Sequence, residues 1–170
     1  MTYKDKEIKK FLKESNAIER EYSDTALNDA LKAWKYLERN AKNGITTKSI
    51  LKIHGIMLKR LNPRIAGKYR ECDVWIGGNC KKFISKGLLK SDVRTFLDDY
   101  RLNSRKLLEI EKEEICKKSH IQFEFVHPFE DGNGRVGRIL YLFQRMRLGL
   151  LIHIIHEGKE QMEYYKWFKN

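Results

Sequence analysis

Apolar residues recur at helical spacing along most of the chain, and this pattern predicts a mostly α-helical protein. Thr47 is placed to cap the helix that begins there, and Asn62 and Pro63 end it. A further helix is expected to open at Arg135. The other helical patterns cover residues 26–37, 92–102, 107–126 and 157–170.

The final predicted helix has Met162, Tyr165 and Phe168 on one face, which we expect to pack on the core. Two prolines and the lack of any Ser/Gly-rich stretch leave no candidate linker, so we expect one domain over residues 1–170. A core in a chain of this size buries roughly 70% of the unfolded surface.

One segment, residues 67–84, departs from helical spacing. Residues that favour β-strands occur at Val74, Trp75 and Ile76, and Gly77 then breaks the run. This pattern predicts a short β-hairpin.

The net charge of +12, from 35 Lys and Arg against 23 Asp and Glu, is typical of nucleic-acid binders. The basic residues are spread along the chain without a block of five or six. We therefore favour a solvated basic surface over a nucleic-acid partner. Such a surface would still speed encounter with anionic ligands.

The first residues, MTYKDKEIKK, alternate in charge and predict no secretory leader. No apolar run approaches the roughly 20 residues that span a bilayer. Cys72, Cys80 and Cys116 lack metal-ligand spacing, which suits a reducing compartment. We expect a cytoplasmic protein without a membrane partner.

The most informative stretch is residues 127–138, HPFEDGNGRVGR. His127 is suited to general-base work because its unperturbed pKa of about 6.5 lies near cellular pH. Asp131 offers the hard oxygen ligand that Mg²⁺ takes when it is bound mainly to nucleotide phosphates. The stretch therefore combines a base with a candidate metal ligand.

The glycines of this stretch predict an anion cradle. Gly132 and Gly134 allow a tight turn and a close approach of backbone amides, and Asn133 between them tolerates the same dihedrals. Arg135 and Arg138 are three positions apart, so they share a helix face beside the same anion. Two guanidinium groups suit a triphosphate better than a monophosphate.

This stretch resembles the signature of the Fic family, H-x-F-x-[D/E]-G-N-G-R-x-x-R, with every fixed position filled. The resemblance implies the Fic fold, a compact helical bundle with a hairpin flap, and transfer of AMP from ATP to a Ser, Thr or Tyr hydroxyl. That hydroxyl belongs to a target protein or to the chain itself. By resemblance, His127 is the base, Phe129 a core anchor and Asp131 the Mg²⁺ ligand.

The same resemblance implies roles for the cradle. Gly132, Asn133 and Gly134 correspond to the hole for the transferred α-phosphate, and Arg135 and Arg138 to the pair that holds the distal phosphates. The related Doc-like kinases typically carry a lysine at the position of Gly134, so the glycine favours AMP transfer. Kinase-like transfer, removal of AMP from modified proteins and a non-enzymatic basic binder stay open as alternatives.

Near the start, Ser15 and Glu19 lie one helical turn apart and resemble the Fic inhibitory motif [S/T]-x-x-x-E-[G/N]. In the family this glutamate pairs with the second motif arginine, here Arg138, and blocks the γ-phosphate of ATP. Arg20 stands where Gly or Asn is expected and offers Glu19 a competing partner. We take residues 1–24 as a candidate inhibitory helix; the alternative is a solvated charge on an amphipathic helix.

The predicted hairpin resembles the Fic flap, which docks a target segment as an added strand. Val74, Trp75, Ile76 and Gly77 are then the candidate docking residues; the alternative is a surface hairpin with Trp75 closing a small core. His120, Glu124 and His127 also form an H-x-x-x-E-x-x-H pattern, which is conceivable for a metal. We favour a partly buried structural role for His120.

Overall fold

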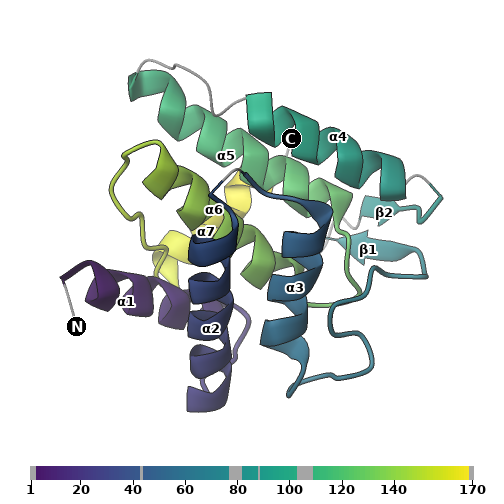
Figure 1. The fold of residues 1–170 in the computed structure, drawn as a ribbon, viewed down its shortest axis with the longest axis horizontal. Helices are drawn as coiled ribbons and strands as arrows, with labels where there is room; N and C mark the ends of the chain where they lie inside the picture. Colours follow the sequence, from purple (N-terminus) through teal and green to yellow (C-terminus); the bar gives the residue numbers. More distant parts are fainter. Residues whose placement is uncertain (1–2, 43, 77–81, 88, 103–108, 169–170) are drawn as a thin grey trace.

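The structure is a computed structural model that describes residues 3–42, 44–76, 82–87, 89–102 and 109–168. It confirms a mostly helical architecture (Figure 1). The helices, in chain order, are α1 (Tyr3–Ile18), α2 (Asp24–Asn40), α3 (Thr47–Leu58), α4 (Leu89–Leu102), α5 (Glu109–Val126), α6 (Asn133–Arg147), α7 (Lys159–Tyr165) and a 3₁₀ turn (Lys166–Phe168). None of these described helices is both long and apolar enough to cross a membrane.

Helix α6 lies at the centre of the bundle, with α5 as its main partner and α1, α2 and α3 packed around it (Figure 1). Every residue from Arg135 to Arg145 on this helix is buried. The core includes Leu37, Phe96, Phe123 and Ile139. A helix enclosed on all sides holds its polar side chains in fixed directions, which matters for the arginines at its start.

Several helix boundaries differ from the sequence prediction: α1 ends at Ile18 and not at residue 24, α3 ends at Leu58 before Asn62, and α7 covers only Lys159–Tyr165. Thr46, not Thr47, caps α3: its hydroxyl accepts the Ser49 amide at 3.2 Å, and its own amide donates to the Ser49 hydroxyl at 2.7 Å. This reciprocal capping box satisfies two amides at once, which a single cap at Thr47 could not do. Helix α6 begins at Asn133 rather than Arg135.

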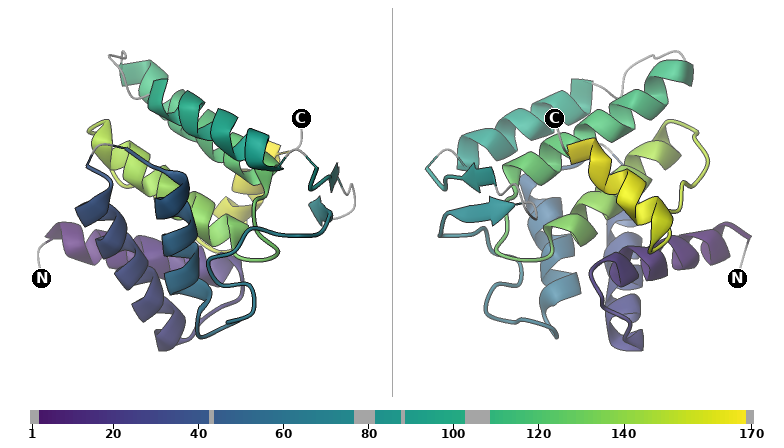
Figure 2. Two further views of the ribbon diagram at one scale, coloured as in Figure 1. Left: turned by 45° about the vertical axis from the view of Figure 1, so that its right-hand side comes forward. Right: turned by 180° about the vertical axis from the view of Figure 1, so that it is seen from behind.

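The predicted packing face of the last helix is wrong for Met162 and Tyr165, whereas Phe168 is partly buried and packs against the core as predicted. The side chains of Met162 and Tyr165 are 60% and 38% exposed, whereas Tyr164 is 3% exposed. Tyr164 packs with Ile18 and Ile155 in a small cluster that joins α7 to the end of α1 (Figure 2). The helix is too short for its apolar spacing to reveal which face meets α1.

Strands β1 (Val74–Ile76) and β2 (Lys82–Ile84) form an antiparallel pair in which Val74 lies opposite Ile84 and Trp75 opposite Phe83. Figures 1 and 2 place this pair at one edge of the bundle, near the loop between α5 and α6. Gly77 lies outside the described residues.

Helix α1 ends in a Schellman motif. The amide of Glu21 donates to the carbonyl of Asn16 at 3.0 Å, and the amide of Arg20 donates to the carbonyl of Ala17 at 2.8 Å. Arg20 holds the left-handed position with φ 58°. This position favours Gly or Asn for steric reasons, which explains physically why those residues are expected there.

Replacing Arg20 with glycine should therefore stabilise the protein by about 1 kcal/mol, because the left-handed conformation no longer crowds a Cβ. Urea unfolding of wild type and Arg20→Gly measures the change. Lys13→Gly is the matched control, since a glycine inside the exposed face of α1 should destabilise by about 1 kcal/mol. A loss of stability in both variants would contradict this account of the helix end.

Candidate active site

His127 lies in the loop directly after α5, with φ 46°. Its amide donates to the carbonyl of Phe123 at 3.0 Å, and its Nδ1 lies 3.1 Å from the carbonyl oxygen of Glu124. Because a carbonyl can only accept, the neutral ring carries its proton on Nδ1 and keeps a lone pair on Nε2. Burial lowers the pKa of His127, and the positive charge of Arg70 acts in the same direction. The ring is thus prepared to accept a proton at neutral pH.

Arg70 holds the backbone around this histidine. Its side chain donates to the carbonyls of His127 at 2.8 Å, Cys72 at 2.8 Å and Ser85 at 3.0 Å, and its amide donates to Pro128 at 3.0 Å. One buried guanidinium therefore joins the histidine loop to the base of the hairpin. Sequence reasoning missed Arg70, because its partners are all backbone carbonyls and leave no signature in residue type.

Asn133 fixes the turn that follows. Its side-chain oxygen accepts the amide of Phe129 at 2.9 Å, and its side-chain nitrogen donates to the carbonyl of the same residue at 2.8 Å. Asn133 does not use the unusual dihedrals that its residue type tolerates, because it is the first residue of α6; its contribution is this side-chain latch. Phe129 itself is fully buried.

His54 supports the same turn through contacts with Phe129 and Asp131. Its ring stacks on Phe129 with centroids 3.7 Å apart, its Nδ1 accepts the Gly67 amide at 2.9 Å, and its Nε2 lies 3.1 Å from the carbonyl oxygen of Asp131. Burial lowers the pKa of His54 to about 4, so the ring is neutral and donates from Nε2. This contact sets the backbone position of Asp131.

Asp131 presents its carboxylate at the edge of the loop, with 61% of the side chain exposed. One oxygen accepts the Gly132 amide at 2.5 Å, and the other lies 3.2 Å from Arg135 Nη2. Within the described residues no group of three His, Cys, Asp or Glu side chains converges to hold a metal. A lone exposed carboxylate fits the way Mg²⁺ binds, with most remaining ligands supplied by phosphates and water.

The two cradle glycines have different physical roles. Gly132 has φ 80°, and a Cβ there would lie 2.8 Å from Leu58. Gly134 lies inside the first turn of α6 and makes no tight turn, which corrects the sequence expectation. Its missing Cβ leaves the space that the carboxylate of Glu19 and the guanidinium of Arg138 fill. The first amides of α6 lack intrahelical partners and suit an anion.

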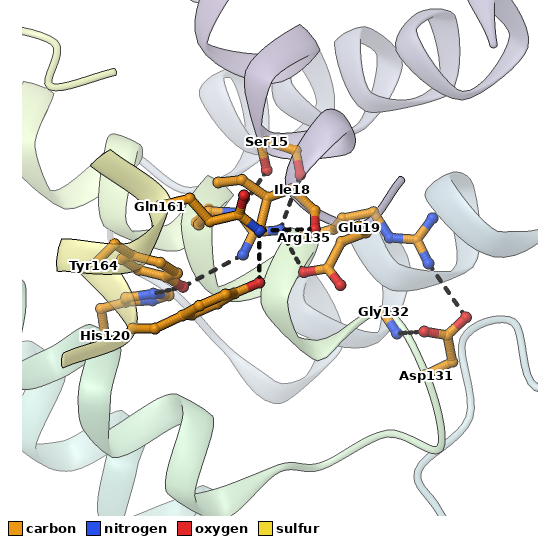
Figure 3. Close-up of polar contacts among 11 residues, drawn as sticks. Ser15, Ile18, Glu19, His120, Asp131, Gly132, Arg135, Gln161 and Tyr164 are labelled. Carbon is orange, nitrogen blue, oxygen red and sulfur yellow. Dashed lines mark hydrogen bonds and ion pairs between the residues drawn. The ribbon is translucent and has the colours of Figure 1, made fainter. Parts of the chain in front are cut away.

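Arg138 donates hydrogen bonds to Ser15, Glu19 and Tyr164, which Figure 3 labels. It is 2% exposed and donates to the Ser15 hydroxyl at 2.9 Å, the Ser15 carbonyl at 2.9 Å, the Glu19 carboxylate at 2.7 Å and the Tyr164 hydroxyl at 3.3 Å. The structure thus brings Ser15, Glu19 and Arg138 together. Arg20 does not prevent the Glu19–Arg138 ion pair.

Arg135 points in another direction. Figure 3 shows its guanidinium directed toward Asp131, and its side chain is buried. Its Nε atom is buried without a hydrogen-bond partner among the described residues. A buried cationic donor with spare capacity suits an anionic ligand.

The H-x-x-x-E-x-x-H pattern does not form a metal site in the described part of the chain. His120 is fully buried, deeper than predicted, and its Nε2 lies 2.8 Å from the Tyr164 hydroxyl. Burial raises the pKa of Glu124 to about 7. His127 belongs to the loop beyond this pair.

In this helical bundle a histidine loop runs into the N-terminus of a buried, arginine-bearing helix, an arrangement that suits an anionic ligand. The family described as Fic/DOC matches residues 44–144, which is more than half of the chain. The chain therefore belongs to the Fic/DOC family.

Two relatives are proteins named Protein adenylyltransferase Fic. The one from Aedes aegypti is 29% identical over 142 residues, and the one from Drosophila grimshawi is 30% identical over 139 residues. Each match covers 81% of this chain but only 27% and 28% of the relative. The chain thus spans just over a quarter of the length of these proteins.

Solved structures share the fold. Fic-1 from C. elegans has a TM-score of 0.80 at 20% identity, covering 98% of this chain and 55% of that one. A Fic-domain signaling protein from Bacteroides thetaiotaomicron has a TM-score of 0.79 at 21% identity, covering 96% and 70%.

Replacing Asn133 with alanine should cost about 2 kcal/mol or more, because it leaves two buried backbone groups of Phe129 without partners. Thermal or urea unfolding measures the loss. Asn40→Ala is the matched control: the exposed Asn40 makes one bond, to the carbonyl of Tyr36, and its loss should stay within about 0.5 kcal/mol. Equal effects would show that the side-chain latch does not hold the loop.

Proposed function

We propose that this chain is a protein adenylyltransferase that transfers AMP from ATP to a hydroxyl of a target protein. The observation that carries the proposal is His127, whose Nδ1 lies against a carbonyl and whose loop runs into the N-terminus of α6, a helix bearing two buried arginines. The names of the two relatives support it. We take residues 1–170 as one Fic domain, and the free thiols of Cys72 and Cys116 support a reducing, cytoplasmic location.

The proposed reaction begins with removal of the proton from the target hydroxyl. His127 Nε2 accepts that proton as the oxygen forms a bond to the α-phosphorus, and the bond between this phosphorus and the bridging oxygen of the β-phosphate breaks. Pyrophosphate leaves. The lowered pKa keeps the imidazole neutral and able to accept.

Binding of the nucleotide is assigned to the start of α6. The amides of Gly132, Asn133 and Gly134 receive the α-phosphate, and Arg135 and Arg138 receive the distal phosphates. Asp131 would hold Mg²⁺, which neutralises phosphate charge when bound. Positioning and charge stabilisation are most of what phosphoryl transfer needs.

We further infer that Glu19 restrains this activity. Its carboxylate accepts a hydrogen bond from the Arg138 guanidinium, which a distal phosphate would need for its own binding. The same carboxylate lies against Gly134. Ser15 adds two further acceptors from α1. A carboxylate and a phosphate cannot occupy one guanidinium edge together, so the isolated chain should transfer slowly.

Target docking is assigned to the hairpin, with Val74, Trp75, Ile76 and Gly77 as the candidate docking residues. Main-chain pairing of an added strand would supply the affinity. Arg70 supports this role because it donates to the carbonyl of Ser85, at the end of the hairpin, and to the carbonyl of His127. These two bonds connect the docking segment to the catalytic histidine. The chain itself is also a candidate target.

Removal of AMP from a modified protein is a second candidate. The carboxylate of Glu19 lies against Gly134, close to the expected place of the α-phosphate, where it could activate water. The two activities respond oppositely to the loss of Glu19: transfer should rise, whereas AMP removal should fall.

Transfer is tested with Mg²⁺ and ATP labelled at the α-phosphate, alone and in a host lysate. Glu19→Gly should raise protein labelling at least about 10-fold, the worth of one charge-assisted hydrogen bond. Adding His127→Ala to that variant should lower labelling about 100-fold or more.

The control is Glu21→Gly, because the Glu21 carboxylate accepts the Ser23 amide instead of Arg138. It should label like wild type. Label transferred equally well without His127 would contradict the assignment of the base. Label that appears only from γ-labelled ATP would indicate a kinase.

Transfer by Glu19→Gly should also depend on pH in a predictable direction. The base works while neutral, and burial lowers its pKa, so the rate should be flat from about pH 7 upward and fall to half below about pH 6.5. Initial rates from pH 5 to 8 measure this profile. A midpoint above pH 7 would contradict the inferred state of His127.

A further inference from the structure

Among the described hydrogen-bond partners of Arg138, Tyr164 lies outside the N-terminal segment that carries Ser15 and Glu19. The hydroxyl of Tyr164 accepts from Arg138 Nη1 at 3.3 Å, and the guanidinium lies 5.8 Å from the centroid of the Tyr164 ring. Tyr164 belongs to α7, which lies beyond the family match of residues 44–144. It is 3% exposed, so its hydroxyl is directed into the protein and not toward solvent.

The direction of the Tyr164 hydroxyl is set by His120. The hydroxyl lies 2.8 Å from His120 Nε2, and the two rings stack with centroids 5.6 Å apart. Burial, together with the charge of Arg138, lowers the pKa of His120 to about 3, so this ring is neutral. Because the Tyr164 oxygen accepts from Arg138, its own proton needs an acceptor, and the neutral His120 ring offers Nε2 when its proton is on Nδ1.

Tyr164 comes from another helix than the inhibitory residues, although it packs against Ile18 at the end of α1. The bonds from Arg138 to Ser15 and Glu19 depend on where α1 lies. The bond to Tyr164 depends on α5 and α7. When Glu19 yields its place to a phosphate, the Tyr164 contact can stay and keep the guanidinium in the same orientation. A long buried side chain without that contact would lose its fixed direction.

We propose that Tyr164, oriented by His120, is a positioning residue that aims Arg138 at the distal phosphates of ATP. The inference rests on the proposed function, because it needs Arg138 to bind those phosphates. Its consequence is selectivity: Tyr164 should matter for a nucleoside triphosphate and not for a monophosphate.

The test measures ATP and AMP affinity by calorimetry with Mg²⁺, using full-length Glu19→Gly as the background so that Arg138 is accessible. Tyr164→Phe removes only the hydroxyl. It should weaken ATP binding about 10-fold, the loss of one bond to a charged group, and change AMP binding less than about two-fold. The AMP affinity also shows that the variant is folded.

Two further variants complete the design. Tyr165→Phe is the matched control, because this neighbouring hydroxyl bonds to Gln161 and not to Arg138; it should leave both affinities unchanged. His120→Phe removes the acceptor that orients Tyr164 and should weaken ATP binding in preference to AMP binding.

The outcomes separate this inference from the proposed function. An unchanged ratio of ATP to AMP affinity in Tyr164→Phe, or equal losses of both, would overturn the positioning role while the background still binds ATP. A background that binds no ATP would overturn the proposed function and this inference with it.

Discussion

The buried charge of Arg138 is the constraint on which the rest of the site depends. Removing a guanidinium from water costs several kcal/mol, and only well-placed acceptors offset that cost. Here the acceptors come from Ser15 and Glu19 at the end of α1 and from Tyr164 on α7. Helices far apart in sequence must therefore meet at the start of α6.

Two glycines of α6 make room for these contacts. At Gly134 the absent Cβ admits the Glu19 carboxylate, and at Gly137 it admits Glu124 and His120 from α5. A Cβ at either place would displace these side-chain ends from their positions against α6.

Three side chains hold the loop between α5 and α6 in place. Asn133, His54 and Arg70 all bond to backbone groups of the loop, and together they keep His127 in a left-handed conformation. Such a conformation persists only when its surroundings determine it. Under the proposed function, His127 is thus a rigidly held base. Access of ATP to the phosphate-binding start of α6 then depends on the position of the Glu19 carboxylate.

The sequence by itself determined the helical class and indicated the candidate chemistry of residues 127–138, because periodicity and a contiguous motif are local properties. It also indicated the pairing of Glu19 with Arg138. Tertiary structure alone decided the contributions of Arg70 and Tyr164, and it showed that the Asn133 side chain latches onto the backbone of Phe129. Those contacts join distant segments, often through backbone carbonyls that every residue carries, so no pattern of residue types could reveal them.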